Sequence, residues 1–472
     1  MPSLAPHPDR LLPADPAVRA LARSLYKSVA EAPIYSPHGH VDAELLLRND
    51  YFGGPSELLI TPDHYVVRLL HASGIPLDDL GVTRKGKASA ADGRAVFRAF
   101  CAHWHVFFGT PVHYWFESEF AELFGITEQP SAQTADSIYD QISDALLTER
   151  FRPRSLLERF NLRLLATTDD PSDDLTAHAA LADDPSFAGR VIPTFRADAY
   201  MTPDHSSWLP KLEELAEASN TDTGTYAGLL SALRNRRAFF KQHGCTSTDT
   251  GVPDAWALPL EDVEAERLHA AGMAGTITPD QAVAYRRNML YQFARMSQED
   301  GLVMQLHPGV IRNHHKPTLD QYGPDTGHDL PDTTAFTLPL QRVLNDFGTN
   351  PSFRLVLFTV DETAFSREIA PLAGFYPSVY VGAPWWFIDT PAAIHRFRGA
   401  ATDSAGFYKT SGFIDDTRAF CSIPARHDMS RRLDAGYLAG LVATHQLSEE
   451  DAHRIVQDLV EKIPVDTFRL KV

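Results

Sequence analysis

The chain has 472 residues, of which 44% are hydrophobic and 22% are charged, and its formal net charge is -18. This is the composition of an ordinary globular protein, and it excludes the disordered and fibrous classes. The sequence has no long run of Lys or Arg, whereas a nucleic-acid-binding protein usually presents a basic face; we therefore expect no nucleic-acid partner.

The three cysteines, Cys101, Cys245 and Cys421, are widely spaced and odd in number. They indicate neither a disulfide framework nor a CxxC metal site, which favours a reducing compartment. The N-terminus has prolines and charges where a signal peptide has an apolar core, and no apolar run approaches the ~20 residues of a membrane span. We therefore expect a cytoplasmic protein with no membrane partner. The sequence leaves the oligomeric state open, a homo-oligomer included.

The chain begins with a predicted helix and then repeats one pattern eight times. Asp15 followed by Pro16 is a typical helix start, an N-cap residue and a proline at the first helical position. The repeated pattern is an apolar run that leads into polar residues, as in strands buried on both faces. Most stretches between the runs indicate helices. The predicted strands are 34–40, 164–171, 191–196, 244–249, 303–309, 354–361, 379–387 and 412–418.

Two of the later helices have clear start signals. Thr278-Pro279 predicts a helix that continues to about Glu299, before Gly301. The segment from Ser448 to Asp451 predicts a capping box ahead of an amphipathic helix.

Parallel strands that alternate with helices predict an α/β fold of the (β/α)8 TIM-barrel type, whose sites lie at the carboxyl ends of the strands. The long stretch between the first two strands has helical patterns, and we interpret it as a helical insertion that covers the barrel mouth as a lid. The expected organisation is an N-terminal helix and first strand over 1–40, the insertion over 41–157, and the rest of the barrel with C-terminal helices over 158–472.

The segment His38-Gly39-His40 is the strongest local signal for chemistry. Residues two apart in a strand face the same side, so both imidazoles project together. Neutral imidazole is a common ligand of zinc and other divalent metals. Two hydrogen-bonded histidines at a strand end explain the pattern equally well. His307, which ends the fifth predicted strand, and Asp416, in the eighth, extend the candidate ligand set.

Two histidines from the first strand, one from the fifth and an aspartate from the eighth resemble the ligand set of amidohydrolase-type barrels. Further motifs are similar to those of the uronate isomerase family, from about residue 15 to 470. They are Asp63-His64-Tyr65, Pro193 to Arg196, Gln305-Leu306-His307 with Gly309 and Arg312, Asp325 to Gly327, Trp385-Trp386, Asp415 to Arg418, and Arg426-His427.

The sequence departs from the family pattern at four positions. Gly39 stands where a cysteine is expected, and Thr250 stands where the family often has histidine. Asp415 and Thr417 replace the usual threonine and serine around the aspartate. None of these differences removes a proposed ligand.

The resemblance implies aldose-ketose isomerisation of hexuronates, from D-glucuronate to D-fructuronate or from D-galacturonate to D-tagaturonate, through a metal-stabilised enediolate. It implies one divalent metal ion held by His38, His40 and Asp416, with His307 as a fourth ligand or a hydrogen-bonding neighbour. We expect zinc, with manganese or another divalent ion as the alternative. Asp416 is the expected general base.

Tyr65 and His64 are expected to move a proton between the two substrate oxygens; a packed aromatic pair is the alternative. Arg196, Arg312 and Arg418 come from different strand ends and are expected to bind the substrate, because arginine holds a carboxylate bidentately. A structural ion pair is the alternative for each arginine. Two further residues either fill the barrel rim or stack on the sugar: Trp385 and Trp386.

Two other functions compete with this interpretation. A metal-dependent hydrolase of the amidohydrolase superfamily would share the fold and the ligands, but it does not need His64 and Tyr65 together with three arginines. A non-catalytic uronate-binding protein would be expected to have lost a ligand residue, and this chain has lost none.

Overall fold

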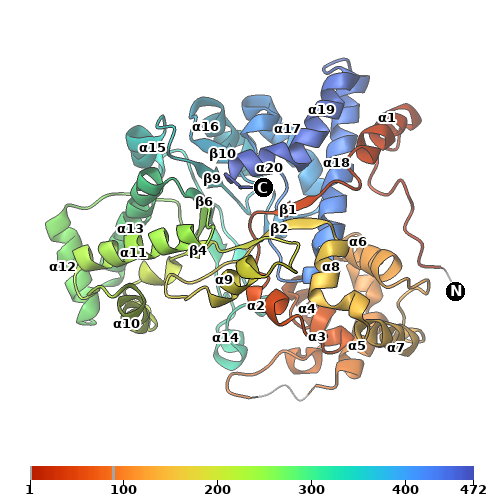
Figure 1. Ribbon diagram of the computed structural model, residues 1–472, viewed down its shortest axis with the longest axis horizontal. Coiled ribbons are helices and arrows are strands. Elements are labelled where there is room, and N and C mark those ends of the chain that lie inside the picture. Colours follow the sequence, from red (N-terminus) through yellow and green to blue (C-terminus); the bar gives the residue numbers. More distant parts are fainter. Residues whose placement is uncertain (1–2, 88–90) are drawn as a thin grey trace.

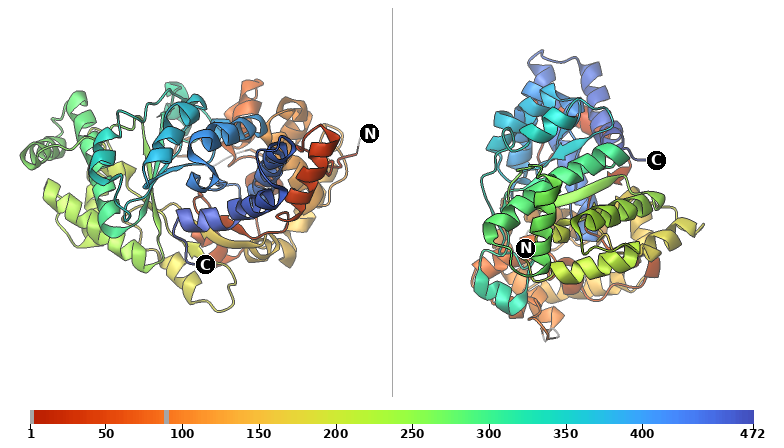
Figure 2. Two further views of the ribbon diagram at one scale, coloured as in Figure 1. Left: turned by 90° about the horizontal axis from the view of Figure 1, so that it is seen from above. Right: turned by 90° about the vertical axis from the view of Figure 1, so that its left-hand side faces the viewer.

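The computed structural model describes residues 3–87 and 91–472, and it places the strands near the middle of the molecule with helices around them (Figure 1, Figure 2). Helix α1 (Pro16–Lys27) begins as predicted, with Asp15 as its N-cap. Helix α13 (Pro279–Asp300) has Thr278 as its N-cap, with a complete capping box, and Gly301 as its C-cap. These two start signals are confirmed.

The parallel strands form two sheets, one in the order β1-β2-β3 and one in the order β10-β9-β6-β5-β4. A short antiparallel pair, β7 with β8, is separate from both. The strands are β1 (Ile34–Ser36), β2 (Leu162–Ala166), β3 (Val191–Ile192), β4 (Phe195–Arg196), β5 (Ser247–Val252), β6 (Val303–Pro308), β7 (Val310–Ile311), β8 (Leu330–Pro331), β9 (Leu355–Leu357) and β10 (Val379–Val381).

The first seven predicted strands each overlap an observed strand, but the eighth, residues 412–418, does not form one. Gly412 and Asp416 have left-handed backbone conformations, with φ of 72° and 40°, which interrupt an extended chain. The segment still lies where the prediction places it. The amide of His40, just beyond β1, donates to the carbonyl of Thr417 at 3.0 Å.

The third predicted strand is divided into β3 and β4 around Pro193, whose nitrogen has no hydrogen to donate to a ladder. Strand β5 pairs in parallel with β6 along its whole length, from Ser247 opposite Val303 onward. The carboxyl ends of the central strands therefore lie side by side.

The stretch between β1 and β2 is built mainly from short helices, drawn in orange to yellow in Figure 1. Their buried aromatic side chains belong to the same hydrophobic cluster as Ile34 of β1 and Leu162 of β2, so the helices pack on the first strands. The stretch is mainly helical, and its role as a separate insertion that covers the site as a lid stays a prediction. The helices are α2 (Ala43–Arg48), α3 (Pro55–Leu59), α4 (His64–Ala72), α5 (Gly93–Ala102), α6 (Pro111–Ser118), α7 (Ala135–Leu146) and α8 (Pro153–Arg159).

The remaining helices follow the later strands, and no helix among the described residues is long and apolar enough to cross a membrane. They are α9 (Thr176–Asp183), α10 (Trp208–Ser219), α11 (Tyr226–Gln242), α12 (Asp262–Met273), α14 (Lys316–Tyr322), α15 (Gln341–Phe347), α16 (Ala370–Phe375), α17 (Pro391–Ala405), α18 (Ile423–Ala443), α19 (Glu449–Val460) and α20 (Lys462–Thr467).

Helix α19 has half of the predicted capping box. The Ser448 hydroxyl accepts a hydrogen bond from the amide of Asp451 at 3.0 Å. The Asp451 carboxylate accepts from the same hydroxyl at 2.6 Å instead of from the Ser448 amide. Aspartate is one methylene shorter than the glutamate of a full box, which accounts for the missing reciprocal bond.

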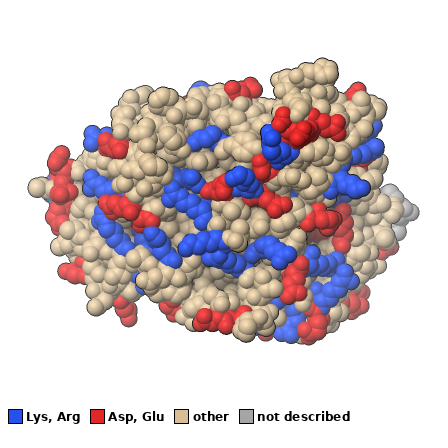
Figure 3. Space-filling model, turned by 45° about the horizontal axis from the view of Figure 1, so that its top comes forward, with Lys and Arg blue, Asp and Glu red and all other residues tan. Residues whose placement is uncertain are grey.

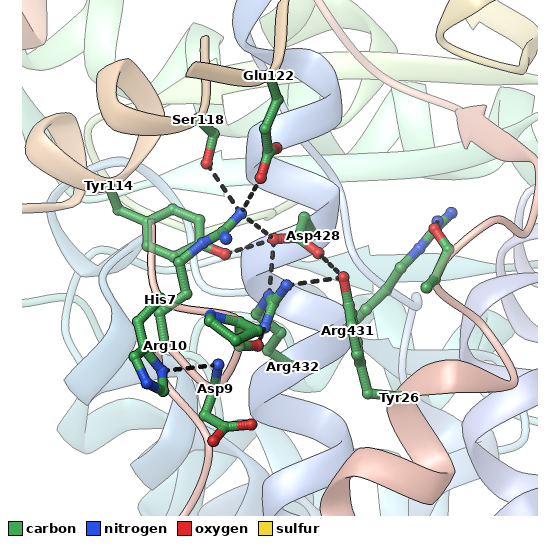
Figure 4. A network of polar contacts seen from close by, with 12 residues as sticks. His7, Asp9, Arg10, Tyr26, Tyr114, Ser118, Glu122, Asp428, Arg431 and Arg432 are labelled. Carbon is green, nitrogen blue, oxygen red and sulfur yellow. Dashed lines mark hydrogen bonds and ion pairs between the residues drawn. The ribbon is translucent and has the colours of Figure 1, made fainter. Parts of the chain in front are cut away.

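Helix α18 ties the N-terminal segment to the insertion through Asp428 (Figure 4). One carboxylate oxygen accepts from the hydroxyl of Tyr26 in α1. The other accepts from the Tyr114 hydroxyl in α6 at 2.5 Å, from Arg10 at 3.2 Å and from Arg432 at 2.8 Å. Because these bonds replace the lost hydration of the carboxylate, they stabilise α18 against both helices.

The surface charge is uneven. Lys and Arg side chains form an interrupted band across the middle of the face in Figure 3, with acidic residues among and around them. The net charge of -18 therefore does not describe every face. The absence of a nucleic-acid partner stays a prediction.

Candidate active site

A cavity of about 270 Å³ contains every residue predicted for the site in its wall. The residues come from the ends of β1, β4 and β6, from the insertion, and from the segments that follow β10. They are His38, His40, His64, Tyr65, Arg196, His307, Arg312, Trp385, Trp386, Asp416 and Arg418.

Three histidines surround the Asp416 carboxylate. The Nε2 atoms of His38 and His40 lie 3.2 Å and 3.0 Å from its Oδ1 atom. His38, His307 and Asp416 each offer one ligand atom, and these atoms lie within 4.8 Å of one another. Burial alone would raise the pKa of Asp416, but His38 and His40 hold the pKa well below its usual value.

The side chains of this cluster fit a divalent metal ion. His38 Nδ1 and His307 Nε2 are buried and have no hydrogen-bond partner among the described residues. Such unpaired buried atoms are uncommon, because their desolvation is not offset. Imidazole and carboxylate together form a donor set that suits zinc and similar ions.

Asp249 also belongs to the site, although it was not predicted there. Its Oδ1 atom lies 2.9 Å from Nδ1 of His307, and its Oδ2 atom lies 3.0 Å from Nη1 of Arg196. Burial raises the pKa of Asp249, but Arg196 and His307 outweigh it and hold the pKa well below its usual range. The signal in the sequence was its position at the end of the fourth predicted strand.

The three arginines differ in how firmly they are held. Arg196 also donates to Asp198 at 2.9 Å, so acidic partners occupy much of its guanidinium. Nη1 of Arg312 lies 2.9 Å from the Asp329 carboxylate, and the guanidinium lies 5.0 Å from the centroid of the Trp386 ring. Within the part of the chain that the structure describes, the only ion pair of Arg418 is an exposed contact of 3.7 Å with Asp325. Such a pair is weak, so Arg418 is the most available of the three.

His64 and Tyr65 begin helix α4, where Asp63 caps the helix by accepting from the Tyr65 amide at 2.8 Å. Their rings are stacked with centroids 4.7 Å apart. Burial lowers the pKa of His64 to about 3, assisted by the charges of Arg418 and Arg426. Burial also raises the pKa of Tyr65 well above its usual value. At neutral pH this pair is therefore a neutral imidazole beside a neutral phenol.

The sequence matches the glucuronate isomerase family over residues 17–468. Uronate isomerases of Corynebacterium efficiens and Xanthomonas oryzae are 50% and 47% identical, over 99% of this chain and of each relative. The chain belongs to the glucuronate isomerase family. The glucuronate isomerase structure from Caulobacter crescentus has a TM-score of 0.97 at 43% identity, covering 100% of this chain and 98% of that one.

Other solved structures extend the similarity. A uronate isomerase from Thermotoga maritima has a TM-score of 0.91 at 27% identity, covering 98% of this chain and 99% of that one. A putative metal-dependent hydrolase from Lactobacillus casei shares the fold, with a TM-score of 0.53 at 15% identity and coverage of 95% and 99%. The resemblance seen in the sequence is confirmed, and the chain is an isomerase of this family.

The departures from the glucuronate isomerase family pattern leave the cavity intact. Thr250 is buried beside Asp249 in β5, but successive side chains of a strand point to opposite faces. Among the described residues that line the cavity, Asp249 is present and Thr250 is not. A Cβ atom at Gly39 would lie 3.6 Å from its nearest neighbours, which include the unpaired Oδ1 atom of Asp415. Glycine is therefore not required sterically at this position.

The wall also contains unusual backbone conformations. Trp386 and Asp416 have φ of 53° and 40°, and Asn313 and Asp325 have φ of 56° and 60°. A non-glycine residue in this region costs on the order of 1–3 kcal/mol, and such residues cluster at functional sites. The conformation of Trp386 aims its ring at His64, with centroids 5.3 Å apart.

A set of buried ion pairs lies beside the cavity, and the sequence motifs gave its members no role; one member, Arg426, also lines the cavity. Nη1 of Arg426 lies 3.0 Å from the Asp389 carboxylate. Nε2 of His427 lies 3.0 Å from the Asp415 carboxylate. The signal was the Arg426-His427 motif itself, which follows the eighth predicted strand directly.

Proposed function

We propose that the chain catalyses the aldose-ketose interconversion of hexuronates, from D-glucuronate to D-fructuronate or from D-galacturonate to D-tagaturonate. Full-length membership of the family supports this activity. The observation that carries the mechanism is one cavity wall that combines a buried histidine-aspartate cluster, a neutral imidazole-phenol pair and arginines. A hydrolase of the same fold would need the first feature alone.

The cluster would bind one divalent cation through His38, His40 and Asp416. Its imidazole and carboxylate donors favour zinc, with manganese or another divalent ion as the alternative. The close grouping of His38, His307 and Asp416 favours His307 as a ligand over a mere neighbour. Bound there, the ion supplies polarisation of the substrate carbonyl or the adjacent hydroxyl.

Asp416 is the proposed base that takes the proton from C2 and returns it to C1. In the same conversion the oxygen on C2 loses a proton and the oxygen on C1 gains one. Tyr65 is a neutral donor and His64 a neutral acceptor, so the pair suits this transfer between oxygens. No proton is gained or lost overall.

Arg418 and Arg312 are the proposed partners of the substrate carboxylate, because their contacts to Asp325 and Asp329 leave both side chains partly exposed to the cavity. Arg196 would contact substrate hydroxyls while it holds Asp249 in place. Two further residues are proposed to stack on the sugar or to wall the cavity: Trp385 and Trp386.

We also infer that the two parallel sheets belong to one (β/α)8 barrel with the insertion at its mouth. A parallel bridge joins Asp169, three residues after the end of β2, to Phe195 of β4, which supports a link between the two sheets. A bridge from Val381 to Thr410, with the bond from His40 to Thr417, supports closure on the other side.

The test is a ketose assay on both hexuronates after chelation and metal add-back. We expect ketose to form from at least one, to stop after chelation and to return with zinc or manganese. Binding of both sugars without turnover in added metal would contradict the proposal, and hydrolysis of uronate esters or lactones in place of isomerisation would favour the hydrolase.

A further inference from the structure

Arg426, in the first turn of α18, is almost completely buried, with 1% of its side chain exposed. Its Nη1 atom donates to the Asp389 carboxylate at 3.0 Å and reaches the carbonyl of Asp415 at 3.5 Å. Its Nε atom donates to the Ser422 hydroxyl at 3.0 Å. Arg426 is one of the residues that line the cavity, but these donors bond to the protein itself, including the chain next to Asp416.

The same guanidinium also lies over two aromatic rings of the insertion. Its central carbon lies 3.6 Å from the centroid of the Trp115 ring in α6 and 5.2 Å from that of Tyr65 in α4. These two rings meet edge to face with centroids 5.4 Å apart. One side chain therefore joins the ring of Tyr65 to the segment that carries Asp416, although the two come from opposite ends of the sequence.

Buried acids surround this single cation. Burial raises the pKa of Asp389 to about 7 and the pKa of Glu119 to about 8, and the charge of Arg426 opposes both shifts. A buried charge is tolerated only where partners compensate it, and Asp389 provides the direct one. Lysine would keep the charge but lose the planar group that stacks on a ring while its edge donates.

We infer that Arg426 is a positioning residue that fixes the Tyr65 ring relative to Asp416, so that the hydroxyl meets the substrate oxygens while the carboxylate meets the carbon-bound proton. The inference rests on the proposed roles of Tyr65 and Asp416. Arg426 acts through Tyr65 and does not touch the reacting atoms.

The same helix offers a matched control. Arg432 also donates to a carboxylate, that of the partly buried Asp428 at 2.8 Å, and lies 4.2 Å from the ring centroid of Tyr26. Arg426 is among the described residues that line the cavity, whereas Arg432 is not. Arg432→Lys therefore makes the same chemical change on α18 without touching the site.

The experiment compares Arg426→Lys, Tyr65→Phe and the double variant of the metal-loaded protein. We expect Arg426→Lys to lower kcat by ~10–100-fold, because misplacement by about 1 Å costs up to ~10²-fold. KM should change by less than about threefold, since the substrate-binding arginines remain. Metal content should be unchanged. In the Tyr65→Phe background the arginine substitution should change kcat by less than about threefold, because the group it positions is already absent.

Multiplicative effects in the double variant would overturn the inference while leaving the proposed role of Tyr65 intact. A near-normal kcat for Tyr65→Phe alone would overturn the role of Tyr65 and the inference with it. A fall in kcat of the same size for Arg432→Lys would also overturn the inference, because it would show that any loosening of α18 lowers kcat. If Arg426→Lys does not fold, Asp389→Asn is the alternative variant, because it removes the charge that orients Arg426 while the side chain at position 389 keeps its shape. The same non-additivity with Tyr65→Phe is then expected.

Discussion

Helix α18 contributes to two polar clusters that differ in their hydrogen bonding: a partly buried one around Asp428 and the one at the cavity. Around Asp428, both carboxylate oxygens and the hydroxyls of Tyr26 and Tyr114 have partners within the chain (Figure 4). At the cavity, ring nitrogens of His38 and His307 have none among the described residues.

The difference separates a structural cluster from a functional one. A buried group that has all its partners gains nothing from a ligand, whereas an unpaired one is desolvated without compensation until something binds. We therefore expect substitutions in the Asp428 cluster to change the free energy of unfolding, and substitutions at the cavity to change metal content and catalysis. The following predictions test this division.

The largest effect is expected from removal of a metal ligand. His40→Ala should reduce the metal content of the purified protein by about one equivalent and the ketose-forming activity by at least ~10⁴-fold, because ligand loss removes both the bound ion and the position of the base. Metal analysis beside the ketose assay checks this. Equal metal content in the variant and the unaltered protein would contradict the assignment of His40 as a ligand.

Tyr65→Phe should have the next largest effect. It keeps the stacked ring and removes only the hydroxyl, so kcat should fall by ~10²–10⁴, the range of general acid-base catalysis. Metal content and thermal stability should stay the same. A variant that retains its kcat would make the tyrosine a packing residue, and the relay would then have to involve His64.

The sequence predicted the strands and their polar ends because a strand buried on both faces leaves a continuous apolar run. It did not reveal the left-handed residues Gly412 and Asp416, since conformation at a turn depends on what surrounds it. The eighth strand was predicted wrongly for this reason.

The role of Asp249 could be assigned only from the register of two paired strands. Arg196 and Asp249 are directly opposite each other in the pairing of β4 with β5, and no local pattern encodes that alignment. Arg426 and Asp389 are 37 residues apart and meet only in the folded chain. Residues that hold other site residues in place are thus harder to predict than metal ligands at strand ends, because the ligands recur at the same position in the strand pattern.

Arg418→Lys should have a moderate effect that falls on binding. A charged bidentate hydrogen bond in a closed site is worth ~1.5–3 kcal/mol, so kcat/KM should fall by roughly one to two decades. The change should appear mainly in KM, measured with both hexuronates. A loss confined to kcat would place Arg418 in the chemical step, and an unchanged kcat/KM would leave the carboxylate to Arg312.

The smallest effect on catalysis, and a large one on stability, is expected from Asp428→Asn. The substitution removes the carboxylate that Arg432 and Arg10 share, and among the described residues only Arg10 keeps another one, that of Glu122. The loss should lower the free energy of unfolding by about 3 kcal/mol. Kinetic constants of the folded protein should change by less than about twofold, because the described residues that line the cavity include no member of this cluster.

The pH dependence of stability gives a second readout. Burial would raise the pKa of Asp428, but Arg432, Tyr114 and Tyr26 outweigh it and lower the pKa below its usual value. A carboxylate with a lowered pKa in the folded state stabilises the fold at and above its ordinary pKa, and this contribution is lost as the pH falls through the folded value. The thermal midpoints of Asp428→Asn and the unaltered protein should therefore differ at neutral pH and converge as the pH is lowered. A gap that persists undiminished in acid would show that the aspartate contributes through shape and not through charge.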